Sequence, residues 1–273
     1  MQIKSNSVTF NCRVEGPEGA SWMVLSHGLA TDLTMWDELT EALTPRYRVL
    51  RYDARGHGDT EAPAGDYTLD MLVADVVGLL DALKIDKAHF CGLSMGGMVG
   101  QGLALDHPRR IISASICDSR HTTTPAFSTG WHQRAAEVRK GGIEAIVDST
   151  ITRWSSEGLS ERRPDIVERL RRMIRKTSPD GYCGCAIALA GLNYGHRLGE
   201  IAKPMLFLTG SEDHGAPPEG TREMHRAVAG SRFVEITQAG HISNVEQPEA
   251  FNSAVLSLLD DVEAAAKTKE TRP

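Results

Sequence analysis

Three residues of the types used in nucleophilic catalysis follow one another along the chain in the order Ser94, Asp213 and His241. Ser94 is the centre of Gly92-Leu93-Ser94-Met95-Gly96, which fits the pattern Gly-x-Ser-x-Gly. A serine at a sharp turn from strand to helix is held in a strained conformation with its hydroxyl exposed, and flanking glycines permit the turn. The pattern alone is weak because glycine and serine are common in loops, so an acid and a base must support it.

The predicted elements around these residues place all three at one edge of a sheet. Each residue closely follows a strand-like apolar run, at 88–91, 205–209 and 233–236 respectively. The carboxyl ends of parallel strands meet at one edge, where open α/β sheets bind their ligands. A nucleophilic serine needs a base to take its proton and an acid to orient that base. We therefore predict Ser94 as nucleophile, His241 as base and Asp213 as acid.

Two other carboxylates are alternatives for the acid. Asp118 follows the strand-like run 111–117 and could reach the same sheet edge, while Glu212 is the direct neighbour of Asp213. Asp213 could instead be a turn residue or a helix cap. We prefer Asp213 because it lies in the loop directly after a predicted strand, and Asp118 remains the more serious alternative.

The negative charge that develops during acyl transfer needs two backbone N–H donors. One donor is expected from Met95, which follows the nucleophile at the start of a helix. The second is expected from Leu29, in the loop after the strand-like run 22–26. Because the backbone supplies both donors, the side chains at these positions matter little.

Strand-like runs alternate with helical patterns along most of the chain, which predicts the α/β class with a mostly parallel, doubly wound sheet. The alternation breaks in the segment 122–197, which reads as mostly helical. We predict a core formed by 1–121 and 198–263, a helical lid formed by 122–197, and a flexible tail at 264–273. A helical insertion between two strands would lie over their carboxyl ends, above the predicted site.

Composition narrows the class of protein. The chain has 273 residues and a net charge of −6, which argues against nucleic-acid binding. No apolar run approaches the roughly 18 to 20 residues of a membrane span, and the N-terminus lacks the apolar core of a signal peptide. Five cysteines form no zinc-like or disulfide pattern. We predict a cytoplasmic protein with a small-molecule partner and no metal; the oligomeric state stays open.

Several motifs together resemble the α/β-hydrolase family. They are His27-Gly28, Asp53-Ala54-Arg55-Gly56-His57-Gly58, the serine pentapeptide, Gly210-x-x-Asp213-x-x-x-Pro217 and Gly240-His241. The resemblance covers nearly the whole chain and implies a serine hydrolase that cleaves a carboxylic ester or lactone without a cofactor. It also implies that the turn containing His57 is structural, so that His57 is not a rival base.

Longer segments are similar to 3-oxoadipate enol-lactonases, which open a small anionic enol-lactone in aromatic degradation. These segments are 31–37, 89–101 and 241–252. The segment 118–125 departs from the lactonase pattern beside the expected pocket, so the substrate stays open. Carboxylesterases, acyl-homoserine-lactone lactonases, carbon–carbon hydrolases and slow small-ligand receptors of this fold share the same triad.

The lid supplies three candidate substrate-binding residues, Trp131, Arg134 and Trp154. An anionic substrate needs a cation, and Arg134 could hold a carboxylate with two parallel hydrogen bonds. The alternative is a solvated helix arginine. A basic run at 162–176 reads as an amphipathic helix whose positive field could steer anions modestly.

Overall fold

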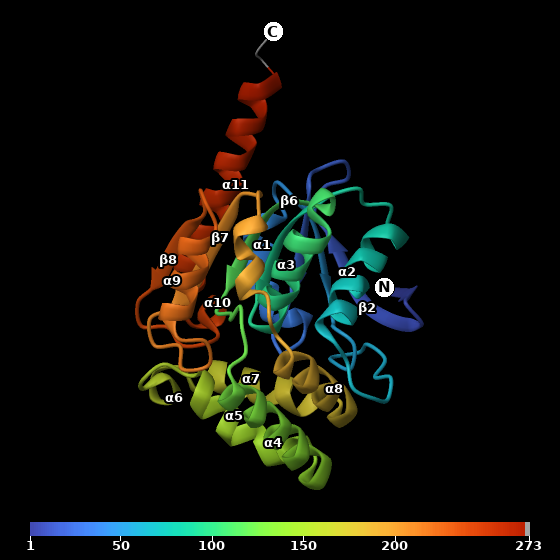
Figure 1. The fold of residues 1–273 in the computed structure, drawn as a ribbon, viewed down its shortest axis with the longest axis vertical. Coiled ribbons are helices and arrows are strands. Elements are labelled where there is room, and N and C mark those ends of the chain that lie inside the picture. Colours follow the sequence, from blue (N-terminus) through green and yellow to red (C-terminus); the bar gives the residue numbers. More distant parts are fainter. Residues whose placement is uncertain (271–273) are drawn as a thin grey trace.

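An eight-stranded sheet forms the centre of the protein, whose computed structural model describes residues 1–270 (Figure 1). The strand order is β1-β2-β4-β3-β5-β6-β7-β8. The β1–β2 and β2–β4 pairs are antiparallel, and every pair from β4 to β8 is parallel. The strands are β1 (Gln2–Ser5), β2 (Val8–Glu15), β3 (Trp22–Ser26), β4 (Arg48–Tyr52), β5 (Ala88–Leu93), β6 (Ile111–Cys117), β7 (Met205–Gly210) and β8 (Arg232–Ile236).

Helices cover both faces of this sheet. Strands β5 and β7 are buried at every position, as expected for parallel strands with helices above and below. The helices outside the lid are α1 (Asp37–Leu43), α2 (Leu69–Ala82), α3 (Met95–Asp106), α9 (Pro218–Ala227), α10 (Ser243–Glu246) and α11 (Pro248–Glu270), with short 3₁₀ turns η1 (Leu33–Trp36), η2 (Pro108–Arg110) and η4 (Gly195–Glu200). This architecture confirms the predicted mostly parallel α/β class.

The segment between β6 and β7 is helical and gathers at one end of the sheet (Figure 1). We call it the lid; it contains α4 (Pro125–Gly141), η3 (Ile143–Ile146), α5 (Val147–Trp154), α6 (Leu159–Arg162), α7 (Pro164–Lys176) and α8 (Pro179–Ala190). Its helix starts follow local rules. The Thr124 side chain accepts a hydrogen bond from the N–H of Phe127, and Ser178 caps α8 in the same way, each with proline at the next position.

The basic residues of α7 are mostly paired with carboxylates. Arg169 pairs with Glu38 of α1, and Lys176 pairs with Asp59, so both connect the lid to the core. Arg163, Arg171, Arg172 and Arg175 pair with Asp165, Asp148, Glu168 and Glu144. The apolar side of α7 is buried, as predicted. These pairs reduce the positive field that the basic run would otherwise produce.

Two glycines let the lid approach the core closely. A Cβ atom on Gly181 of α8 would lie 2.3 Å from the Cα atom of Gly56 in the loop after β4, and Gly56 has a φ of +75°. Real Cβ atoms do not come so close to backbone atoms, so this contact requires glycine.

The chain end differs from the prediction. Where we predicted a flexible tail from residue 264, α11 continues as a helix to Glu270 and extends beyond the sheet (Figure 1). Residues 271–273 of the predicted tail lie outside the described residues. Within the described range, no helix is both long and apolar enough to span a membrane. All five cysteines are buried and free.

Candidate active site

Ser94 lies at the turn from β5 to α3 in a strained backbone conformation, with φ of 54° and ψ of −112°. Its glycine neighbours are required by close packing. A Cβ atom on Gly92 would lie 2.1 Å from the carbonyl oxygen of Gly96, and one on Gly96 would lie 2.0 Å from that of Ser26. The turn thus presents the serine side chain at the carboxyl edge of the sheet, as strand-to-helix nucleophile turns do.

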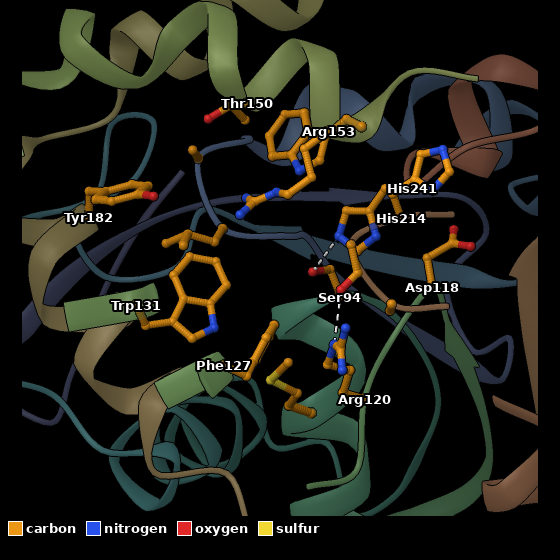
Figure 2. Close-up of a pocket in the computed structure, with 16 residues that line it drawn as sticks. Ser94, Asp118, Arg120, Phe127, Trp131, Thr150, Arg153, Tyr182, His214 and His241 are labelled. Carbon is orange, nitrogen blue, oxygen red and sulfur yellow. Dashed lines mark hydrogen bonds between the residues drawn. The ribbon is translucent and has the colours of Figure 1, made fainter. Parts of the chain in front are cut away.

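The structure brings Ser94, His241 and Asp213 into one line of contacts. The Nε2 atom of His241 lies 2.9 Å from the Ser94 hydroxyl, and its Nδ1 atom lies 2.9 Å from each Asp213 carboxylate oxygen. Figure 2 shows Ser94 and His241 meeting at the cavity. The Asp213 side chain is buried and also accepts backbone hydrogen bonds of 2.7 Å from Gly215 and Ala216. These donors fix the carboxylate towards the imidazole.

Neither alternative carboxylate forms a hydrogen bond or an ion pair with His241 among the described residues. Asp118 is fully buried and accepts hydrogen bonds from the Gly210 N–H (2.8 Å) and the Ser243 hydroxyl (2.5 Å). It therefore joins the loops that carry Asp213 and His241. Burial, and then the nearby Asp213, raise the pKa of Asp118 well above its usual range. Glu212 accepts a hydrogen bond from the backbone of Glu157 in the lid.

The N–H groups of Leu29 and Met95 donate no hydrogen bond within residues 1–270. Leu29 lines the same cavity as Ser94, and Met95 follows Ser94 directly. The loop that carries Leu29 is held by His57, whose Nε2 atom accepts the N–H of Ala30 at 3.0 Å. Burial, and then the neighbouring His27, lower the pKa of His57 to about 3, so this imidazole is neutral near pH 7 and can accept that N–H.

The lid contributes to the position of His241. The backbone N–H of His241 donates to the carbonyl oxygen of Trp154 at 2.8 Å. The centres of the imidazole and indole rings lie 6.3 Å apart, and the ring planes make an angle of 30°. Buried Glu246 accepts hydrogen bonds from the backbone of Gly240 and from the backbone and hydroxyl of Ser156. The loop that carries His241 is therefore held to the lid both at His241 itself and, through Glu246, at Ser156.

A cavity of about 190 Å³ lies over Ser94 between the lid and the sheet (Figure 2). Trp131 and Trp154, two of the predicted substrate-binding residues, line it. Arg134 is not among the lining residues. Its Nε donates to the Tyr182 hydroxyl at 3.0 Å and its Nη2 to Thr150 at 2.6 Å, so it lies behind the cavity wall.

Two other arginines, Arg120 and Arg153, line the cavity, although neither is among the predicted substrate-binding residues. Arg153 directly precedes Trp154 in the lid, and Arg120 lies in the segment 118–125 that departs from the lactonase pattern. The position of Arg153 beside a predicted pocket residue, and that of Arg120 in the divergent segment, could therefore have indicated that both lie at the cavity. For metals, no three His, Cys, Asp or Glu side chains within residues 1–270 converge as a ligand set.

Comparison with known proteins establishes the family. The model of the alpha/beta hydrolase fold family matches residues 21–248, so this chain belongs to that family. The chain is 35% identical to 3-oxoadipate enol-lactonase 2 of Acinetobacter baylyi, covering 94% of this chain and 95% of that protein.

Solved structures agree. The enol-lactonase from Burkholderia xenovorans LB400 matches with a TM-score of 0.92 and 38% identity, covering 95% of this chain and 100% of that chain. A thermophilic esterase from Thermogutta terrifontis, with malate bound, matches with a TM-score of 0.90 and 29% identity over 96% and 98% of the two chains. The protein is thus an enol-lactonase-like hydrolase of the α/β-hydrolase superfamily.

Proposed function

We propose that this protein is a serine hydrolase that cleaves a small carboxylic ester or lactone through an acyl-enzyme, with 3-oxoadipate enol-lactone as the favoured substrate. The observation that carries the proposal is the line of contacts from Ser94 through His241 to Asp213. The similarity to proteins named as 3-oxoadipate enol-lactonases supports the choice of substrate. The five buried free cysteines are consistent with a cytoplasmic protein.

In the first step, Ser94 attacks the substrate carbonyl while His241 Nε2 takes the hydroxyl proton. Asp213 accepts the Nδ1–H of the imidazole, which leaves Nε2 free to accept, and it stabilises the imidazolium that forms. The N–H groups of Leu29 and Met95 bind the oxyanion of the tetrahedral intermediate. The acyl carbon–oxygen bond then breaks, and the imidazolium returns its proton to the leaving oxygen.

In the second step, water attacks the acyl-enzyme with His241 as base, and Ser94 is released as the free hydroxyl. Trp131 and Trp154 are proposed to hold the apolar part of the substrate, since both line the cavity. A cavity of about 190 Å³ suits a small acyl compound.

The nucleophile and the acid are tested by substitution. Ser94→Ala is expected to lower kcat by about 10⁴-fold or more, and Asp213→Asn by about 10³- to 10⁴-fold, because the imidazole loses its orienting acceptor. Asp118→Asn is expected to lower kcat less than about 10-fold, since Asp118 touches loops rather than the imidazole. A severe loss in Asp118→Asn with a mild loss in Asp213→Asn would make Asp118 the acid.

The substrate is tested by one hydrolysis panel of 3-oxoadipate enol-lactone, an acyl-homoserine lactone, γ-butyrolactone and short p-nitrophenyl esters. We expect the highest kcat/KM on the enol-lactone. Activity confined to neutral esters would contradict the enol-lactone assignment but leave the serine hydrolase intact. Slow single turnover on every compound would instead indicate a ligand receptor.

A further inference from the structure

We propose that Arg120 and Arg153 form a two-point anion site on the wall of the active-site cavity. Arg153 binds a carboxylate that the substrate carries, and Arg120 binds the second carboxylate that hydrolysis creates. The site therefore binds the short dicarboxylate that hydrolysis produces, and this product inhibits the enzyme. This inference rests on the proposed ester or lactone hydrolysis and adds the two residues that recognise the charges of substrate and product.

Arg153 has neither a hydrogen-bond acceptor nor a carboxylate partner among residues 1–270. It lies on the lid helix α5 and points into the cavity (Figure 2). Within residues 1–270 it makes no hydrogen bond and no ion pair, and its Nε atom is buried without an acceptor. Its guanidinium carbon lies 5.2 Å from the centre of the Trp131 ring. A buried, unpaired donor is costly, so a ligand acceptor is the expected partner.

Arg120 is the second cation of the cavity. Its Nε atom donates to the carbonyl oxygen of Gly215 at 2.9 Å, and its guanidinium carbon lies 4.2 Å from the centre of the Phe127 ring. No carboxylate among residues 1–270 lies within ion-pair distance of it. The Gly215 backbone packs against the His241 ring, so Arg120 is held on the side of the cavity where the reacting groups meet (Figure 2).

The acidic side chains near the cavity do not pair with the two arginines. Asp118 lines the cavity, but its oxygens accept hydrogen bonds from Gly210 and Ser243, and burial favours its neutral form. The Asp213 carboxylate is committed to His241. Arg153 remains a cation near pH 7, because burial and the nearby Arg134 lower its pKa only to about 10. Both guanidinium groups thus lack a carboxylate partner among residues 1–270, although the Asp213 charge acts on both from a distance.

The chemistry of the reaction explains why there are two arginines. Hydrolysis of a lactone that already bears one carboxylate adds water across the acyl carbon–oxygen bond. The ring oxygen leaves with a proton, and the acyl carbon becomes a second carboxylate with release of one further proton to solvent. A substrate with one negative charge thus becomes a product with two. Arg153 provides specificity for the first charge, and Arg120 stabilises the charge that appears beside Ser94.

The site is tested first by binding, which requires no catalysis. In Ser94→Ala protein, calorimetric titration is expected to show that adipate binds at least 10-fold more tightly than hexanoate. Adding Arg153→Gln or Arg120→Gln is expected to weaken adipate binding at least 10-fold each, the loss of one charge-assisted contact. The control Arg172→Gln changes an exposed arginine of α7 and is expected to bind adipate as before. Equal binding of adipate in all these proteins, or none in the Ser94→Ala parent, would overturn the site.

Turnover separates this inference from the proposed function. With Ser94 present, Arg153→Gln is expected to lower kcat/KM for 3-oxoadipate enol-lactone about 100-fold, mainly through KM. The ratio of its kcat/KM on the enol-lactone to that on p-nitrophenyl acetate is expected to fall at least 10-fold, whereas the control Arg172→Gln is expected to keep this ratio. A parallel loss on both substrates would mean that Arg153 only supports the fold. Failure of every hydrolysis assay would sink the proposed function while the adipate titration still tests the anion site.

Discussion

At the residue scale, the protonation state of His57 decides whether it can hold the loop that carries Leu29, the proposed oxyanion donor. Its Nε2 atom accepts the Ala30 N–H only while the imidazole is neutral. The pKa of His57 is about 3 in the folded protein and about 6.5 in the unfolded chain. Between these values the unfolded chain binds more protons, so the stabilising contribution is complete above pH 6.5 and is lost as the pH falls.

We therefore predict that the free energy of unfolding falls by about 2 kcal/mol from this one group between pH 8 and 5. His57→Gln, which retains an acceptor, is expected to reduce this slope by close to one proton. The measurement is urea unfolding at several pH values. His132→Gln is the control because His132 is exposed on α4. An unchanged slope in His57→Gln would show that another group is responsible.

Residue types and their order along the chain were sufficient to predict Ser94, Asp213 and His241 as neighbours. Each follows a parallel strand, and such strand ends converge wherever the sheet forms. The arginines could not be predicted in the same way. Arg134 and Arg153 both lie on lid helices, and only the packing of α4, α5 and α8 decides which of them faces the cavity. Whether a side chain on a lid helix points into the cavity depends on tertiary contacts rather than on local sequence.

At the element scale, the contact between Gly181 and Gly56 controls how α8 sits on the core. We predict that Gly181→Ala destabilises the protein by about 1 to 3 kcal/mol, because the added Cβ atom would meet the Gly56 backbone and force the two segments apart. The same change is expected to lower kcat, since the lid also holds His241 through Trp154. Thermal unfolding and ester hydrolysis measure the two effects.

Gly130→Ala is the matched control for this substitution. Gly130 lies within α4, and a Cβ atom there would meet nothing within 4 Å. Alanine is a better helix former than glycine, so this change is expected to stabilise the protein by about 0.5 to 1 kcal/mol. If both substitutions shifted Tm in the same direction and by the same amount, the close lid–core contact would not be the cause.

The elements themselves were predictable where their pattern was strong. The parallel strands β3, β5, β6, β7 and β8 are mostly apolar runs, and each was predicted. Strands β1 and β2, at the antiparallel edge of the sheet, were not predicted. Strand β1 has only 4 residues, and β2 alternates polar with apolar residues. The last turns of α11 were missed because their small and charged residues give no apolar stripe, although such residues form helix readily when a longer helix precedes them.

At the scale of the whole molecule, the lid and the core share one hydrophobic interior. A single cluster of buried side chains includes lid residues such as Trp131, Ile174 and Tyr182 together with the strands of the sheet. Two ion pairs also join the lid to the core: Arg169 pairs with Glu38, and Lys176 pairs with Asp59. The apolar interior of the lid is therefore continuous with that of the core.

We predict from this continuity that the lid and the core unfold in one transition, because neither can lose its packing without exposing the apolar surface of the other. Calorimetry is expected to give a single peak whose calorimetric and van't Hoff enthalpies agree. Native-state hydrogen exchange is expected to give the same opening free energy for slow amides of α8 and of β5. Two peaks, or earlier exchange throughout α8 with β5 still protected, would show that the lid opens independently and that the anion site assembles only when it closes.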